Sequence, residues 1–333
     1  MGYLRLDLFP RRKFNKQTFD KYYTEYEQYL FTNKPVKYQI VAPLENFDCA
    51  SNSSVIKLSS YVRIVPANST FYPDIISENL NKWMNELCPE VEYWTPPKFF
   101  LEIDCEMERN KVPSKCKERI EDDMIKSVRE VFRILRLYKE GNFTCGFIYW
   151  FPKTPCDPPH NYDDIFSFHG NYYTPNGYSI KKNDVKKLQN LFQEYSKNLN
   201  NKDFPHSAIF YLDKGVKRNE PTDSLVDFTA ALEYLLVKGK QEITFTLKIY
   251  TASFLKGYQQ NGREISEDIK KAYDFRSKIV HGRSYKVDEF KCMEISKKIE
   301  GYARKAIIKW LDMIDKGKTA KEIYDSIEKK LLS

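Results

Sequence analysis

The sequence predicts an α+β domain over residues 1–178 followed by an all-α helical bundle over residues 179–333. Three observations support this division. Strand-like runs alternate with amphipathic stretches in the first half, whereas helical periodicity dominates the second half. Between the two, residues 152–178 concentrate Pro, Asn, Gly, Asp and Tyr, a composition that breaks regular structure. The length of 333 residues agrees with two domains of ordinary size.

In the first domain, the predicted helices and strands are interleaved. Apolar residues at helical spacing predict helices over residues 17–32, 75–87 and 117–139. β-branched and aromatic runs bounded by Pro, Asn or Ser predict strands over residues 36–43, 55–66, 99–107 and 145–151. The third helix should turn one apolar side toward a core, formed by Met124, Val128, Val131, Ile134 and Leu135.

The second domain reads as helix almost throughout. Capping residues and apolar periodicity predict helices over 185–199, 206–216, 225–237, 244–255, 266–281, 287–314 and 318–332. Gly282 is a suitable terminator for the fifth of these helices. The sixth has an apolar stripe that we expect to face the centre of a bundle, consisting of Ile295, Ile299, Ala303, Ala306, Ile307 and Trp310.

Composition limits the classes of protein. The chain is 41% hydrophobic, 15% aromatic and 30% charged, with a mean hydropathy of −0.62, which is typical of a folded protein. No apolar run approaches the roughly 18 residues that span a bilayer, and the N-terminus lacks the apolar core of a signal peptide. We therefore expect a cytoplasmic protein that does not associate with a membrane.

The seven cysteines form an odd set without a C-x-x-C motif, so reduced thiols are expected. Cys105 and Cys116 have the same spacing as Cys145 and Cys156, and a four-thiolate zinc site can be drawn from them. Structural zinc sites usually place two ligands within two to four residues, however. The interpretation as free thiols is favoured, and we expect neither a metal nor a cofactor.

Positive charge gathers in the second half of the chain. The net charge is +8, and residues 181–333 carry 31 basic and 22 acidic side chains. An excess of this kind suits a polyanionic partner such as RNA, although solvated helical domains often have a similar excess.

Signatures of phosphate-loop ATPases, dinucleotide-binding enzymes, zincins and α/β-hydrolases are absent from the sequence. The residues best equipped for chemistry are Arg276 and His281, in AYDFRSKIVHGRSY at the end of a predicted helix. An Arg can bind a phosphodiester, and a His can remove a proton from a ribose 2′-hydroxyl or protonate the leaving 5′-oxygen. Five residues on an ideal helix turn about 140° beyond a full turn, so the two side chains share a face only if the helix loosens or a dimer combines them.

Three segments and one single residue around this pair resemble the HEPN superfamily, and within it the Apea-like HEPN branch associated with bacterial and archaeal phage defence. They are DSLVDFTAALEYLL at 223–236, EITFTLKIYTASFL at 242–255, Arg263, and YDFRSKIVHG at 273–282. The resemblance covers roughly residues 183–315. LRLYKEGNF at 135–143 is more weakly similar to the region that precedes the unit in such proteins.

The resemblance implies a helical HEPN bundle that dimerises and brings two Arg-x4-His motifs to one cleft. It also implies a metal-independent endoribonuclease that cuts RNA, with tRNA as one candidate substrate, and leaves a 2′,3′-cyclic or 3′-phosphate and a 5′-hydroxyl. Arg276 and His281 would be catalytic. Ser277 and Glu233 would support them, Glu233 by orienting Arg276 through a charged hydrogen bond or by forming a purely structural ion pair. Lys278, Arg283 and Lys286 would contribute positive charge for RNA, or be ordinary solvated side chains.

The implied role is an antiviral toxin of the abortive-infection type, activated by a phage-derived trigger or a regulatory partner. By analogy with fused HEPN proteins, the first domain would have a sensing role or would inhibit the second domain. The alternative is a non-catalytic HEPN module that uses the same motif to bind RNA, a nucleotide or a protein partner. A scaffold built on the helical bundle is a third hypothesis.

Overall fold

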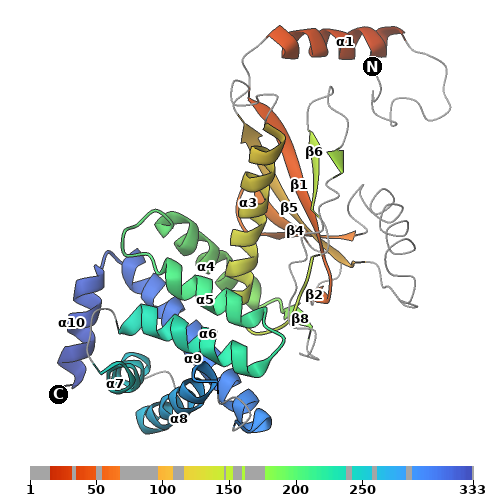
Figure 1. Ribbon diagram of the computed structural model, residues 1–333. Coiled ribbons are helices and arrows are strands. Elements are labelled where there is room, and N and C mark those ends of the chain that lie inside the picture. Colours follow the sequence, from red (N-terminus) through yellow and green to blue (C-terminus); the bar gives the residue numbers. More distant parts are fainter. Residues whose placement is uncertain are drawn as a thin grey trace, which may run out of the picture. The chain divides into compact units, whose positions relative to one another are not determined.

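The computed structural model describes residues 16–31, 35–49, 55–67, 97–107, 116–145, 148–152, 160–161, 177–237, 242–256, 261–282 and 287–331 (Figure 1). Within these residues the chain forms a small sheet unit and a helical unit, so the α+β region is followed by a helical region as expected. The sheet unit includes the chain up to Glu130, and the helical unit takes in Val131–Asn142 as well as the chain from Asn183 onward.

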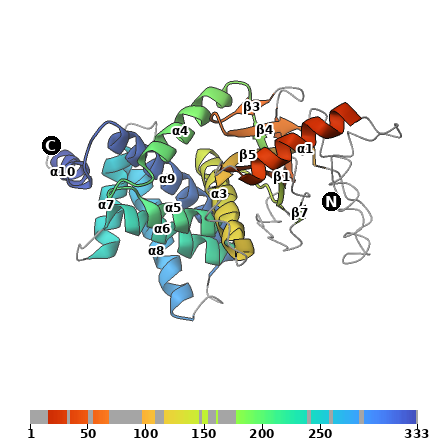
Figure 2. The same ribbon diagram turned by 90° about the horizontal axis from the view of Figure 1, so that it is seen from above.

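The sheet unit contains a six-stranded antiparallel sheet in the order β3-β4-β5-β1-β6-β7 (Figures 1 and 2). Its two central strands, β1 and β5, pair over nine residues, from Val36 opposite Met107 to Leu44 opposite Phe99. The elements of this part of the chain are α1 (Lys16–Phe31), β1 (Val36–Leu44), β2 (Phe47–Cys49), β3 (Ile56–Lys57), β4 (Val62–Pro66), β5 (Phe99–Met107), β6 (Tyr149–Pro152), β7 (His160–Asn161) and β8 (Tyr178–Ile180).

Burial in the centre of this sheet is continuous. Ile40, Val41 and Ala42 of β1 are all fully buried although successive side chains of a strand point to opposite faces. Both faces of β1 are therefore covered. On β5, Glu102 is buried but paired, because Arg63 of β4 forms ion pairs with both Glu102 and Asp104.

Two predicted elements of this unit need correction. The strand expected over 55–66 is a hairpin of β3 and β4, because the Ser59 hydroxyl accepts hydrogen bonds from the amides of Tyr61 and Val62 and fixes a turn. The strand expected over 145–151 is shorter, since β6 begins only at Tyr149. The helix expected over 75–87 lies outside the described residues.

The remaining helices are α3 (Cys116–Tyr138), α4 (Asp184–Asn198), α5 (His206–Val216), α6 (Pro221–Leu236), α7 (Ile243–Leu255), α8 (Gly262–Val280), α9 (Glu289–Asp315) and α10 (Ala320–Leu331). No helix among the described residues is long and apolar enough to cross a membrane. Most bounds agree with the predicted helices to within two residues. The expected stripe of α9, from Ile295 to Trp310, is buried throughout.

Two helices begin earlier than their apolar patterns predicted. α6 begins at Pro221, whose fixed φ and missing N–H suit the first helical position, and not at residue 225 as predicted. α8 begins at Gly262 because the Asn261 side chain accepts a hydrogen bond from the Arg263 amide at 3.0 Å. Ser266, the first residue of the predicted range, lies inside the helix.

α6 is the central helix of the helical unit. It contacts α5, α7, α8 and α9, and nearly all its residues from Ser224 to Leu236 are buried. A helix that is apolar around most of its circumference must be enclosed by others. Glu233 and Tyr234 are exceptions on this helix, and both lie on the groove described below.

The last turns of α3 are bound into the helical unit by a buried polar network. Arg136, only 2% exposed, donates to Asp213 of α5 at 2.8 Å, and Arg304 of α9 donates to the Arg136 carbonyl oxygen at 3.0 Å. Burial alone would raise the pKa of Asp213, but Arg136 and Lys217 lower it below its ordinary value. These contacts explain why Val131–Asn142 belongs with the helices and not with the sheet.

Close packing of α5 on α6 predicts a strong effect at Gly215. A Cβ at this position would lie 2.5 Å from Cε1 of Phe228, a ring that is 3% exposed. We expect Gly215→Ala to lower the free energy of unfolding by about 1–3 kcal/mol, because overpacking outweighs the helix propensity of Ala. Urea unfolding measures this change.

Gly301→Ala is the matched control, because it lies within α9 and a Cβ there has no atom within 4 Å. This substitution should stabilise the protein by up to about 1 kcal/mol. Equal effects of the two substitutions would contradict the described packing of α5 on α6.

Candidate functional site

Arg276 and His281 lie at the C-terminal end of α8. The helix remains regular through this segment, since the His281 amide donates to the Ser277 carbonyl at 3.1 Å. Gly282, with φ of +70°, then ends it. α8 ends at Val280, and the bond to Ser277 keeps the chain on the helical path up to the His281 amide, which on an ideal helix is about 140° from Arg276. One chain alone therefore does not bring Arg276 and His281 to the same side of the helix.

Glu233 of α6 holds Arg276. Arg276 Nη2 donates to Glu233 Oε2 at 3.1 Å, and the two side chains are 25% and 18% exposed. Arg276 also lies over the ring of Tyr273, with its Cζ 5.3 Å from the ring centroid. Burial raises the pKa of the Glu233 carboxyl, and the positive charge of Arg276 opposes this rise. The charged hydrogen bond expected between these two residues is present.

The ion pair is not fully satisfied. Glu233 Oε1 and Arg276 Nε are both buried without a hydrogen-bond partner in the described structure. The carboxylate thus holds the guanidinium through one oxygen instead of by a bidentate pair. Arg276 is oriented by one hydrogen bond, and its side chain remains 25% exposed.

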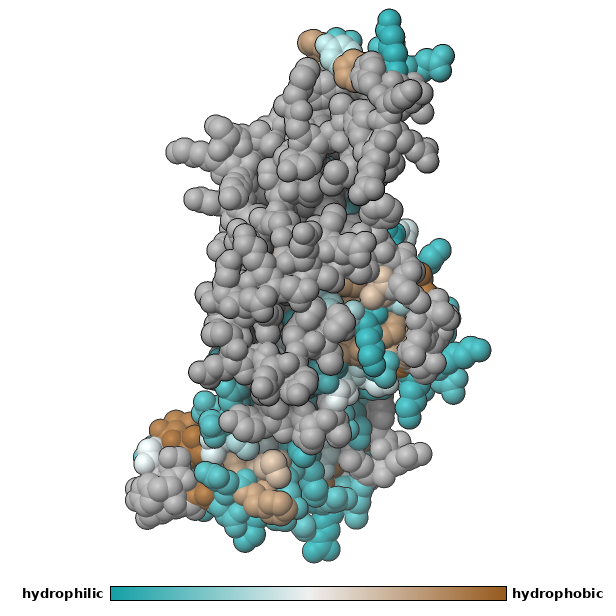
Figure 3. All heavy atoms as spheres, turned by 90° about the vertical axis from the view of Figure 1, so that its right-hand side faces the viewer, coloured by the Kyte–Doolittle hydropathy of each residue, from teal (hydrophilic) through white to brown (hydrophobic). Residues whose placement is uncertain are grey.

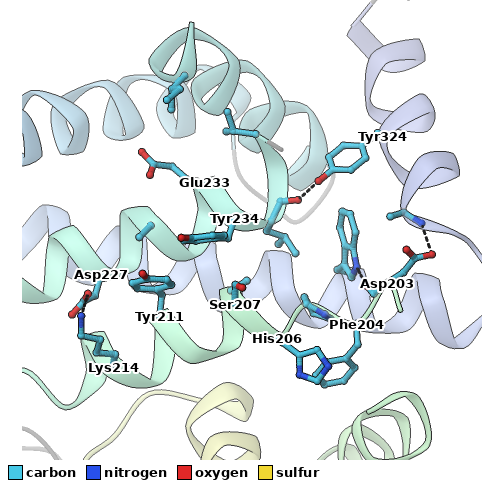
Figure 4. A pocket seen from close by; sticks show the side chains of 18 of the residues that line it. Asp203, Phe204, His206, Ser207, Tyr211, Lys214, Asp227, Glu233, Tyr234 and Tyr324 are labelled. Atoms are coloured by element: carbon cyan, nitrogen blue, oxygen red, sulfur yellow. Dashed lines mark hydrogen bonds and ion pairs between the residues drawn. The ribbon is translucent and has the colours of Figure 1, made fainter. Parts of the chain in front are cut away.

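A groove with a volume of about 910 Å³ extends from this ion pair over α5 and α6 (Figure 4). Tyr211 and Tyr234 stack beside one another in it, as Figure 4 shows, with ring centroids 5.0 Å apart and planes inclined by 12°. Arg276 and Glu233 contribute to its lining, and so do Lys214 and His206. His281 is not among the described residues that line it.

The other predicted site residues are exposed or lie outside the description. Ser277, Lys278 and His281 are exposed on the last turn of α8 and just beyond it. Lys278 lies 5.7 Å from the centroid of the Phe275 ring, and a cation is also favourable at the C-terminal end of a helix. Arg283 and Lys286 lie outside the described residues.

Exposed apolar side chains occur directly before His281 in the sequence and at the start of the next helix. Val280 is 60% exposed, and Phe290 on the first turn of α9 is 64% exposed. Figure 3 shows one face of the molecule, on which hydrophobic residues lie among hydrophilic ones. Large apolar side chains next to a predicted catalytic residue suit contact with another protein surface.

The cysteines that the structure describes with their side chains, Cys49, Cys105, Cys145 and Cys292, form no disulfide. Burial raises the pKa of the Cys292 thiol to about 11, which keeps it protonated. The side chains of Cys116 and Cys156 lie outside the description, so the four-cysteine hypothesis is untested. Among described residues, no group of three or more His, Cys, Asp or Glu side chains could hold a metal ion.

Sequence analysis missed the tyrosine pair of the groove. Tyr211 and Tyr234 are 23 residues apart in sequence and meet only because α5 packs on α6. The sequence contains one signal for this pair: in the apolar run ALEYLL, Tyr234 follows the acidic Glu233. In the structure, Tyr234 is 55% exposed on an otherwise buried helix.

Comparison with family models, curated proteins and solved structures found no match to this chain.

The Glu233–Arg276 contact predicts coupling between the two residues. In a double-mutant cycle of Glu233→Gln and Arg276→Met, the coupling free energy should be about 1 kcal/mol or more, because the pair is partly buried and charged. Urea unfolding of the four proteins measures it.

The matched control is the same cycle, Glu267→Gln and Arg263→Met, on the ion pair at the start of α8, whose side chains are 58% and 85% exposed. Its coupling should be clearly smaller. A Glu233–Arg276 coupling no larger than the control would show that the contact does not orient Arg276.

Proposed function

We propose that this protein is a HEPN-type, metal-independent endoribonuclease of the Apea-like branch that acts in antiviral defence by abortive infection. The observation that carries the proposal is the ion pair between Glu233 of α6 and Arg276 of α8. The resemblance marks these two positions as an acidic helper and a phosphate-binding Arg, and they are distant in sequence. Their contact is what such a site needs.

The chemistry follows from the two side chains of the motif. Arg276 would bind the non-bridging oxygens of the scissile phosphate and stabilise the charge that develops on them. His281 would remove the proton of the 2′-hydroxyl, whose oxygen attacks phosphorus while the bond to the 5′-oxygen breaks. The same imidazole, now protonated, would give that proton to the leaving 5′-oxygen, so one His281 serves each site. The products are a 2′,3′-cyclic phosphate and a 5′-hydroxyl.

The proposed enzyme is a homodimer, since the regular end of α8 separates Arg276 from His281. A two-fold axis near this end would let Arg276 of one protomer face His281 of the other. The exposed Val280 and Phe290 supply apolar surface for such contact. Lys278, together with Arg283 and Lys286, would add positive charge along the RNA path.

One observation favours the alternative of a non-catalytic binding module. Arg276 lines a groove rich in aromatic residues, whereas His281 is not among the described residues that line it. A module that binds RNA, a nucleotide or a protein partner needs Arg276 in the groove but has no use for His281. The two hypotheses therefore differ in the effect of substituting His281.

We expect that induction of the protein in a bacterial host produces RNA fragments with 5′-hydroxyl ends, and that His281→Ala and Arg276→Ala each abolish them. Loss of a positioned acid or base costs about a hundredfold or more in rate. Total RNA from induced cells, with and without phage infection to supply a trigger, is run on gels and its ends are mapped.

Lys271→Ala is the matched control, since Lys271 lies on the same helix, is exposed and is outside the segments that carry the family resemblance. It should cleave like the wild type. RNA that stays intact in all soluble, folded proteins, combined with phage protection that survives His281→Ala, would contradict the nuclease and favour the binding module.

A further inference from the structure

The groove over α5 and α6 contains an aromatic platform that the proposed chemistry does not use. Tyr234 is stacked on Tyr211, yet 55% of Tyr234 remains exposed. It lies between residues of α6 that serve the core, since Leu232 and Leu235 are buried. A large exposed ring held parallel to a second ring does little for the core, but it presents a π-face to a ligand.

The two rings of the platform come from helices that are packed against each other. α5 and α6 approach closely at Gly215 and Phe228, and the rings of Tyr211 and Tyr234 stack on one another. Lys214 lies 5.5 Å from the centroid of the Tyr211 ring. A ring fixed in this way loses little entropy when a planar ligand stacks on it, which is how aromatic side chains bind unpaired bases.

The platform is next to the candidate phosphate site. Glu233 and Tyr234 are consecutive on α6, both line the groove, and Glu233 is 3.1 Å from Arg276 Nη2. A base stacked on Tyr234 would therefore have its phosphodiester on the side of Arg276. The groove volume of about 910 Å³ is at the upper end of ordinary ligand sites, enough for a nucleotide.

Two of the three acidic side chains that line the groove form ion pairs with basic residues. Asp227 forms ion pairs with Lys214 and Arg218, and Glu233 is paired with Arg276. Asp203 accepts a hydrogen bond from the Ala320 amide at 3.1 Å. With these carboxylates engaged, an anionic ligand meets the basic partners without strong repulsion.

We propose that this groove binds an unpaired nucleobase of single-stranded RNA, stacked on Tyr234, with the adjoining phosphate directed to Arg276. Bases within a duplex are stacked on one another and cannot reach such a platform. The substrate class is thus single-stranded or looped RNA and not duplex RNA. The identity of the ligand as RNA rests on the proposed function, whereas the platform itself rests on the geometry of Tyr211 and Tyr234.

Binding of fluorescein-labelled hexa-adenylate tests the proposal by anisotropy, with full-length His281→Ala protein as the background so that the probe is not cut. Tyr234→Ala in this background should weaken binding about tenfold, as expected for the loss of one stacked base. Tyr234→Phe keeps the ring and should bind like the background protein. Blunt-ended RNA duplex should bind more weakly than hexa-adenylate.

Phe245→Ala is the control, because Phe245 on α7 is an exposed aromatic residue, at 57%, and does not line the groove. The Phe245→Ala protein should bind hexa-adenylate as tightly as the background protein. Unfolding curves establish that Tyr234→Ala is folded; if it is not, Tyr234→Leu replaces it with the same expected loss. Binding that is unaffected by loss of the ring, or no binding of hexa-adenylate at all, would overturn the proposal.

A competition arm separates RNA from a free nucleotide. Adenosine monophosphate should displace hexa-adenylate only at much higher concentration; displacement at equal concentration would overturn the assignment to an RNA strand. Failure of the nuclease would be recognised separately, as intact RNA in the induced cells despite binding that depends on Tyr234. Cleavage by the wild type with no effect of Tyr234→Ala would instead overturn this inference alone.

Discussion

The burial of α6 is the constraint on which the rest of the helical unit depends. This helix is apolar around most of its circumference, and α5, α7, α8 and α9 all pack on it. Its last turns carry Glu233 and Tyr234 at the edge of this helix packing. Glu233 contacts Arg276 of α8, and Tyr234 stacks on Tyr211 of α5. The position of Arg276 and the stacking of Tyr211 both follow from the fixed position of α6.

The two residues of the Arg-x4-His motif differ in their surroundings. Arg276 is held by Glu233 and lies over Tyr273, so its guanidinium is oriented before any ligand binds. His281 is exposed at the end of the same helix, beside the exposed Val280. In the proposed enzyme, Arg276 would be oriented before RNA binds, whereas His281 would complete a site only when it comes from a second protomer.

The sequence predicted most of the helices, because apolar periodicity and local capping act over short distances. It also predicted the contact of Glu233 with Arg276, through the family resemblance. It missed the start of α8, which depends on a single side-chain hydrogen bond of Asn261, and the turn that Ser59 creates between β3 and β4. The buried pair of Arg136 and Asp213 and the stack of Tyr211 on Tyr234 could not be predicted, since each joins residues that only tertiary packing brings together.

The most direct test of the central claim is co-expression of the Arg276→Ala and His281→Ala proteins in one host. If each site combines Arg276 of one protomer with His281 of another, mixed dimers contain one complete site. Half of the dimers are mixed at equal expression, so RNA fragments with 5′-hydroxyl ends should return at about one quarter of the wild-type yield. No fragments from the mixture, under conditions in which the wild type cleaves, would contradict a site shared between two protomers.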